Sequence, residues 1–267
     1  MVLSRRARWA LFAAAVLIFI GTAFFVVRYA QGYAFDIGEW RFVRTGAVRL
    51  ESNVSATVTL DGEQIGSIAF IGNTYAADGL VPGTYALRAE REGYSSWSKT
   101  VVVQEGFVTD FTSVLLLDLS LQAASESRSL IRERYGVVSA TPVPTPAASP
   151  TPTVSGTPVP ERGITFADGT LSRDGEVIAT GVLGHEVTDN RGVVLWWTRN
   201  EVWVMWLRDS GELGRLDGDR EILTRLSSVI SFATWWPDDT HVAAVTGTEY
   251  RIIETDTRGG TNIIKLP

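Results

Sequence analysis

The chain has 267 residues, of which 45% are hydrophobic, and it carries a formal net charge of −6. This length is sufficient for two modest domains, each with a core of its own. The absence of cysteine excludes disulfides, thiolate metal sites, cysteine nucleophiles and a lipid-modified N-terminal cysteine.

The charge is unevenly distributed along the chain. Four of the 24 basic residues precede the first acidic residue, Asp36, and these are Arg5, Arg6, Arg8 and Arg28. The rest of the chain therefore holds 20 basic residues against 30 acidic ones, a net charge of −10. An acidic chain without a basic stripe argues against nucleic-acid binding.

The first predicted element is a helix over residues 9–27, WALFAAAVLIFIGTAFFVV, which contains no charged residue. Nineteen helical residues span roughly 28 Å, close to the hydrocarbon thickness of a bilayer. Arginines precede the segment, and Trp9, Tyr29 and Tyr33 flank it where interfacial aromatic residues belong. We therefore expect residues 1–35 to form a cytoplasmic tail and a single transmembrane anchor in contact with lipid. The remainder is then extracytoplasmic, at the cell membrane.

A cleaved signal peptide is the alternative interpretation of this segment. Its apolar region is normally shorter, about 7 to 15 residues, with small residues before the cleavage site. Cleavage after Ala30 would place Arg28 at the third position before the cut, which is unfavourable. Cleavage after Ala34 places Gly32 at that position and stays open.

Residues 46–119 show a pattern of short strands and tight turns. In ATVTLDGEQIG, residues 56, 58 and 60 are apolar and alternate with polar ones, as in a half-buried strand. Asp61-Gly62 then suits a hairpin turn with positive φ, and Pro82-Gly83 forms a second turn before TYALRAE. TVVV and FTSVLLL indicate two further strands.

Three segments of this region together resemble the PEGA domain. They are GAVRLESNVSATVTLDGEQIG, GLVPGTYALRAEREGYSSWSKTVVVQEG and SVLLL, in that order. The resemblance implies a small β-sandwich that serves as an extracytoplasmic interaction module at the cell envelope, without a defined ligand. The proline usual in the first turn is absent from SNVSA, and SIAFIG replaces the Thr-Pro expected after the DGEQIG turn.

Within this region, Tyr94 and Trp97 invite two interpretations. Large rings fill the core of a small sandwich, and Gly93 permits the tight bend before them. The same rings could instead form a platform for a sugar ring. Core packing is the first interpretation, and a ligand platform at Tyr94 and Trp97 is kept as the alternative.

A connecting segment over residues 120–160 follows the predicted sandwich. LQAASESRSLIRERYG suggests a short helix. The next stretch, ATPVPTPAASPTPTVSGTPVP, holds seven of the ten prolines and cannot form a core, so we expect an extended, semi-rigid stalk.

Residues 161–267 are again predicted to be β-structure, with six of the nine tryptophans between Trp196 and Trp236. Turns are expected at Asp168-Gly169 and Asp174-Gly175, and a hairpin about Arg199-Asn200. Two Trp-Trp segments, each followed by a turn and strands, resemble blades of a WD40-like or TolB-like β-propeller. About 107 residues hold only two to three blades, whereas closure needs at least four. The region is then either a shortened propeller or a small open β domain that must pair with something. We therefore expect a partial propeller-like region that self-associates when expressed alone.

The Trp196-Trp197 pair carries a specific structural prediction. Adjacent residues of a strand point to opposite faces, so both rings can be buried only if the strand is covered on both sides.

Residue patterns that carry chemistry are sparse. HEVTD, from His185 to Asp189, has Asp189 where a helical zinc motif has its second histidine, and LDGDRE and PDDT lack the spacing of a calcium loop. We predict no catalytic, cofactor or metal site.

The expected function is that of a non-catalytic binding or structural protein of the cell envelope, with an envelope protein or glycan as its partner. Two alternatives stay open. One is an envelope enzyme that uses His185, His241 and the aspartates of the distal region. The other is an outward-facing sensor that acts through a membrane partner.

Overall fold

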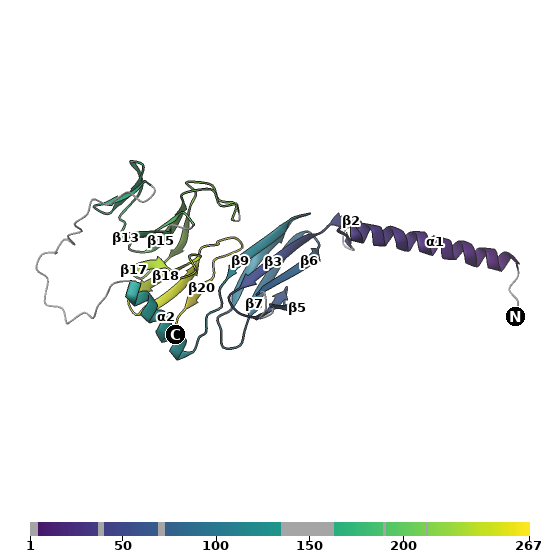
Figure 1. The fold of residues 1–267 in the computed structure, drawn as a ribbon, viewed down its shortest axis with the longest axis horizontal. Coiled ribbons are helices and arrows are strands. Elements are labelled where there is room, and N and C mark those ends of the chain that lie inside the picture. The colour runs from purple at the N-terminus through teal and green to yellow at the C-terminus, as the bar shows by residue number, and fades with distance from the viewer. Residues whose placement is uncertain (1–4, 37–39, 69–72, 135–162, 189–190, 212) are drawn as a thin grey trace, which may run out of the picture. The chain divides into compact units, whose positions relative to one another are not determined.

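The computed structural model describes residues 5–36, 40–68, 73–134, 163–188, 191–211 and 213–267. This part of the chain is mainly β-structure, with several small sheets and one long apolar helix at the N-terminus (Figure 1). It divides into two compact units. Unit 1 comprises Met1–Ala89 and Thr100–Leu115, and unit 2 comprises Glu90–Lys99 and Leu116–Pro267. The predicted Pro/Thr-rich stalk lies outside the described residues.

Helix α1 (Arg5–Ala30) opens unit 1 and has no buried residue. It is long and apolar enough to cross a membrane. Both a membrane anchor and an N-terminal signal sequence have this property. Gly32, with a φ of 80°, ends the helix by adopting the left-handed conformation that glycine tolerates. A short antiparallel hairpin of β1 (Tyr33–Asp36) and β2 (Arg41–Arg44) follows directly.

In the described residues, the rest of unit 1 consists of two small sheets, whose strands also include residues 90 and 97–99 of unit 2. One has the order β6-β3-β9, with β3 antiparallel to β6 and parallel to β9. The other has the order β5-β4-β7-β8. The strands are β3 (Gly46–Ser52), β4 (Ala56–Leu60), β5 (Glu63–Ile68), β6 (Thr74–Leu80), β7 (Gly83–Glu90), β8 (Trp97–Val103) and β9 (Val108–Val114).

Two local predictions for this region are confirmed, whereas the predicted strand FTSVLLL ends at Val114, so Leu115 to Leu117 lie beyond β9. In β4, Ala56, Val58 and Leu60 are all less than 9% exposed, whereas Thr57 between them is exposed. The turn after β4 has positive φ at both central residues, 50° at Asp61 and 83° at Gly62. Such a turn matches the twist of a two-residue hairpin, so Asp61-Gly62 fixes the register of β4 against β5.

Where it is described, unit 2 contains one helix, α2 (Leu121–Arg134), and three antiparallel sheets in chain order. The predicted short helix is therefore present. The sheets have the orders β10-β11-β12, β13-β14-β15-β16 and β17-β18-β19-β20. The strands are β10 (Ile164–Ala167), β11 (Thr170–Arg173), β12 (Glu176–Thr180), β13 (Gly184–Thr188), β14 (Val193–Trp197), β15 (Glu201–Trp206), β16 (Arg220–Arg225), β17 (Phe232–Trp235), β18 (His241–Thr246), β19 (Glu249–Glu254) and β20 (Ile263–Lys265).

Strand β14 is covered on both faces, which is the condition for burial of both rings of the Trp-Trp pair. All five of its residues are buried. Trp196 belongs to a core that includes Ile164 and Leu171 of the first sheet. Trp197 belongs to a second core that includes Trp235 and Ile253 of the last sheet. The middle sheet therefore lies between the other two, and each ring of the pair fills a different core.

The propeller expectation is not supported. In the residues described, the three sheets form successive meanders of three or four strands, and no closed barrel or propeller is found. Three sheets are too few to close a ring of at least four blades, as the length of the region predicts, and a partial propeller-like arrangement stays a prediction.

The outer face of the last sheet is covered by α2, which lies beside β17 and β18 (Figure 1). Ala124 and Ile131 of the helix are 0% and 2% exposed. A fragment of residues 161–267 lacks this helix and would expose the face it covers. That the fragment self-associates, as sedimentation would detect, stays a prediction.

Candidate functional site

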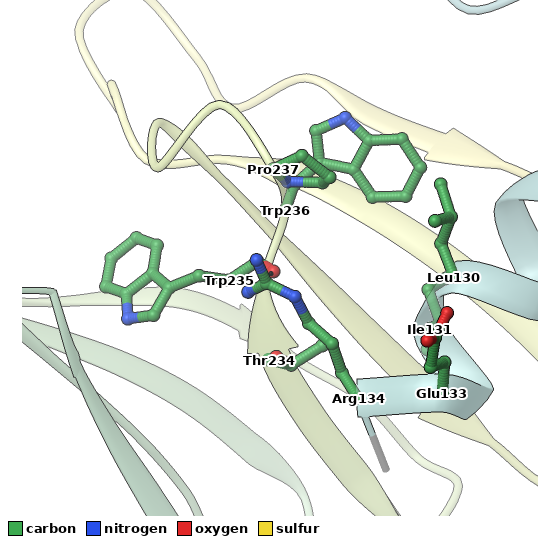
Figure 2. A pocket seen from close by; sticks show the side chains of 8 residues that line it. All are labelled: Leu130, Ile131, Glu133, Arg134, Thr234, Trp235, Trp236 and Pro237. Carbon is green, nitrogen blue, oxygen red and sulfur yellow. Dashed lines mark hydrogen bonds between the residues drawn. The ribbon is translucent and has the colours of Figure 1, made fainter. Parts of the chain in front are cut away.

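A pocket of about 340 Å³ lies beside the C-terminal half of α2 (Figure 2). Its walls come from the helix and from the end of β17 with the turn that follows. The lining residues are Leu130, Ile131, Glu133, Arg134, Thr234, Trp235, Trp236 and Pro237. Figure 2 shows the two indoles pointing to opposite sides, with that of Trp236 on the side of Leu130. The pocket is thus an apolar hollow with charged groups at one end.

The charged end of the pocket is an ion pair supported by backbone groups. The Arg134 guanidinium donates to the carbonyl oxygen of Trp235 at 2.9 Å and lies 3.6 Å from Glu186 Oε1. The other carboxylate oxygen of Glu186 accepts hydrogen bonds from the Thr234 hydroxyl at 2.7 Å and the Trp235 amide at 3.1 Å. Both side chains are about 40% exposed, so solvent reaches the pair.

Helix α2 is held against the sheet by Tyr250. Arg132 Nε donates to the Tyr250 hydroxyl at 2.9 Å. The guanidinium groups of Arg128 and Arg132 lie 5.9 and 5.7 Å from the centre of its ring, within the range of cation–π attraction. Because these contacts fix the helix, the wall that it gives the pocket is also fixed.

The two rings singled out from the sequence lie in unit 2, in different surroundings. Trp97 is 1% exposed, and its Nε1 donates to Glu254 Oε1 at 3.2 Å. Tyr94 is half-buried, with the guanidinium of Arg91 at 4.7 Å from its ring centre. The buried ring of Trp97 has no open face on which a sugar could stack in this conformation. Ligand binding at Tyr94 and Trp97 stays a prediction.

A buried ion pair at Lys99 was not predicted from any local pattern. Its ammonium lies 2.9 Å from Glu254 Oε2, and the two side chains are 0% and 3% exposed. The ammonium also donates to the carbonyl oxygens of Asp256 and Gly260. Burying two charges is costly unless each is paired and hydrogen-bonded, and here the requirement is met.

Asn262 completes this network of Trp97, Lys99 and Glu254. Its side-chain amide donates to Glu254 Oε2 at 2.8 Å and to the carbonyl oxygen of Ser98 at 3.1 Å, and its oxygen accepts from the Ser98 amide at 3.0 Å. Residues 97–99 and the β19–β20 connection are therefore joined by both side-chain and backbone bonds. No local motif could predict this, because the partners lie more than 150 residues apart.

The two histidines lie on different strands and have different neighbours. His241, 3% exposed, contacts Asp238 Oδ2 through Nδ1 at 2.8 Å. Burial alone would raise the pKa of the Asp238 carboxyl, but the hydrogen bond and charge of His241 outweigh it, and the pKa lies below its ordinary value. The ring of His185 packs at 5.2 Å from that of Phe166.

The described aspartates of LDGDRE and PDDT bind protein groups, and Asp217 accepts hydrogen bonds from the distant Arg173 at 2.6 and 3.1 Å. Asp238 Oδ1 accepts from the amides of Thr240 and His241, and Asp219 Oδ2 from the amide of Leu216. Among the described residues, no group of three or more histidine or acidic side chains is arranged to hold a metal ion. Asp189 of HEVTD lies outside the described residues.

The class of protein that emerges is a mainly β chain with a helix of membrane-spanning length at its N-terminus. Within it, residues 45–116 match the family model of the PEGA domain. The match agrees with the resemblance drawn from the sequence.

Two other comparisons add little to this. No curated protein matches the chain. A solved structure entitled Kluyveromyces lactis Hsv2 complete loop 6CD is similar at 12% identity, with 67% of this chain and 59% of that chain covered. Its TM-score of 0.25 is too low to define a shared fold. The comparisons therefore lend no support to a WD40-like or TolB-like propeller.

Proposed function

We propose that this protein is a membrane-anchored, extracytoplasmic binding or structural protein of the cell envelope and that it is not an enzyme. The observation that carries the proposal is the order of elements in unit 1. A helix with the length and apolarity of a membrane span leads through one hairpin into a domain that matches PEGA. A module of this kind, placed directly beyond a span, is suited to bind a partner at the membrane surface.

The pocket beside α2, in unit 2, is a separate candidate site for an envelope partner. Its walls are formed by Leu130, Ile131, Trp236 and Pro237, which suit an apolar side chain. Sugar rings stack on exposed aromatic faces, whereas Trp235 and Trp236 are 3% and 8% exposed. The proposed partner is therefore a protein segment of the envelope rather than a glycan.

Retention in the membrane tests the anchor. We expect the full-length chain to stay in the membrane fraction through carbonate washing and to keep its N-terminus, because residues 9–27 can span the hydrocarbon layer. Mass spectrometry of the washed membranes checks the N-terminus. A variant that lacks residues 9–27 is the control and should be released. Recovery of a soluble mature protein starting near residue 31 or 35 would instead identify a signal peptide.

A further inference from the structure

The hairpin of β1 and β2 packs back along the last turns of α1 instead of projecting away from it (Figure 1). The ring of Phe42, on β2, lies 5.7 Å from that of Phe24 and 5.4 Å from that of Phe25, centre to centre. Phe24 and Phe25 lie within about two turns of the end of the helix at Ala30, which is roughly 8 Å along the helix axis. The hairpin therefore lies at the level of the last residues of the apolar segment 9–27.

The aromatic cluster of the hairpin extends from this contact toward solvent. Phe35 is 5.2 Å from Phe42, and Trp40 is 6.1 Å from Phe35. The outer two rings are the exposed ones, since Phe35 is 39% and Trp40 is 79% exposed. An indole and a phenyl ring left in water beside an apolar helix are unfavourable, whereas the headgroup region of a bilayer accommodates such rings.

Trp40 also has an unusual backbone conformation, with a φ of 51°. The left-handed region is uncommon for a bulky residue, and glycine or asparagine is favoured there. The turn itself therefore does not account for a tryptophan at this position.

The base of the hairpin is fixed to both the helix end and the sandwich of unit 1. The amide and the hydroxyl of Thr45 donate to the carbonyl oxygen of Gly32, at 2.8 and 3.0 Å. The carbonyl oxygen of Thr45 accepts from the amide of Gly106 at 3.1 Å. The next residue, Phe107, is 65% exposed and lies at the same end of the sandwich. This end thus presents further apolar surface beside the hairpin.

Basic residues accompany the aromatic ones. The guanidinium of Arg28 lies 5.6 Å from the ring centre of Phe24 and 5.2 Å from that of Tyr33, and Arg41 and Arg44 are exposed on β2. Guanidinium groups just beyond an apolar span suit the phosphates of lipid headgroups.

We propose that the β1–β2 hairpin is a second membrane-binding element, which inserts Phe35, Trp40 and Phe42 into the headgroup region of the outer leaflet. The inference rests on the proposed function, since it requires α1 to span the membrane. The hairpin binds the lipid bilayer rather than a protein, because Phe42 contacts Phe24 and Phe25 of the span itself. The hairpin then holds the membrane-proximal end of the sandwich against the lipid surface.

The absence of cysteine in the chain makes a direct test practical. Nitroxide labels are attached to the full-length protein at single sites, Ile18→Cys, Trp40→Cys and Asn53→Cys, in vesicles of mixed zwitterionic and anionic phospholipid. Ile18 reports the span. Asn53 is exposed and serves as the water-exposed control. It follows the seven-residue strand β3, which extends about 20 Å away from the hairpin end of the sandwich. Accessibility to oxygen, which partitions into lipid, is compared with accessibility to a water-soluble nickel chelate.

The proposal predicts an oxygen-to-nickel ratio for Trp40 that is several-fold above that of Asn53 and below that of Ile18. A Trp40 value equal to that of Asn53, with Ile18 deep in lipid, overturns the proposal and leaves the anchor intact. A water-accessible Ile18 overturns the anchor, and the hairpin proposal with it. Spin–spin broadening at Trp40 that disappears on dilution with unlabelled protein would show that a second copy, not lipid, covers the site.

Discussion

Replacing Trp97 with alanine is expected to lower the free energy of unfolding by about 3–5 kcal/mol, as large-to-small changes of a buried tryptophan do. The ring is 1% exposed, so the substitution leaves a cavity. The substitution also removes the hydrogen bond that Trp97 Nε1 donates to Glu254. The effect is measured by denaturant unfolding of the purified protein in detergent. Because the protein has two units, the transition is followed separately by near-ultraviolet circular dichroism and by fluorescence.

Two variants separate the contributions to the Trp97 result. Trp97→Phe keeps most of the ring volume and loses the hydrogen bond, so a smaller loss of about 1–3 kcal/mol is expected. Ser96→Ala changes an exposed neighbour and should alter stability by less than about 0.5 kcal/mol. Unchanged stability of Trp97→Ala, together with loss of glycan binding, would instead favour the ligand-platform interpretation.

Replacing Lys99 with methionine should cost about 3–5 kcal/mol, because it leaves the Glu254 carboxylate buried without its cation. The double variant Lys99→Met/Glu254→Gln should recover part of this loss, since no buried charge remains and the amide oxygen can still accept from Trp97. The same unfolding transition, measured for both variants, checks the difference.

An exposed ion pair provides the matched control for Lys99. Arg225 lies 2.7 Å from Glu201, but the arginine side chain is 71% exposed, so Arg225→Met should cost less than about 1 kcal/mol. The geometry indicates that the buried network stabilises the fold. If Lys99→Met lowers the free energy of unfolding by no more than the control does, this interpretation is wrong.

Predictions made from local patterns were confirmed where a local rule decides the structure. The apolar run of residues 9–27 lies within α1, and the alternation of Ala56, Val58 and Leu60 gave the buried face of β4. Strand geometry predicts that Trp196 and Trp197 point to opposite faces, and the structure buries them in separate cores.

Features that depend on distant contacts were not predicted. The Lys99–Glu254 pair joins strands far apart in sequence, and an isolated lysine in a strand ordinarily indicates a solvated position. The helix over residues 121–134 was expected, but its amphipathic pattern does not identify the sheet that it covers or the pocket that results. The β1–β2 hairpin was missed because its strands have only four residues each, too few to show a clear period.

The propeller expectation shows the limit of local similarity. Trp-Trp pairs followed by short meanders resemble blades, and each sheet does form an antiparallel meander. The length of the region already predicts that no ring closes, and the two-fold internal repeat predicts short meanders without specifying how the sheets are arranged.

The most direct test of the central claim is the reaction of single cysteines with a membrane-impermeant maleimide in intact cells. Leu216, which is 63% exposed in unit 2, and Arg6, in the exposed N-terminal turn of α1, are each replaced by cysteine in a chain that has no other. The account predicts that the cysteine at position 216 reacts fully in intact cells and that the one at position 6 reacts only after lysis. A cysteine at position 216 that reacts only after lysis would place unit 2 inside the cell and contradict the account.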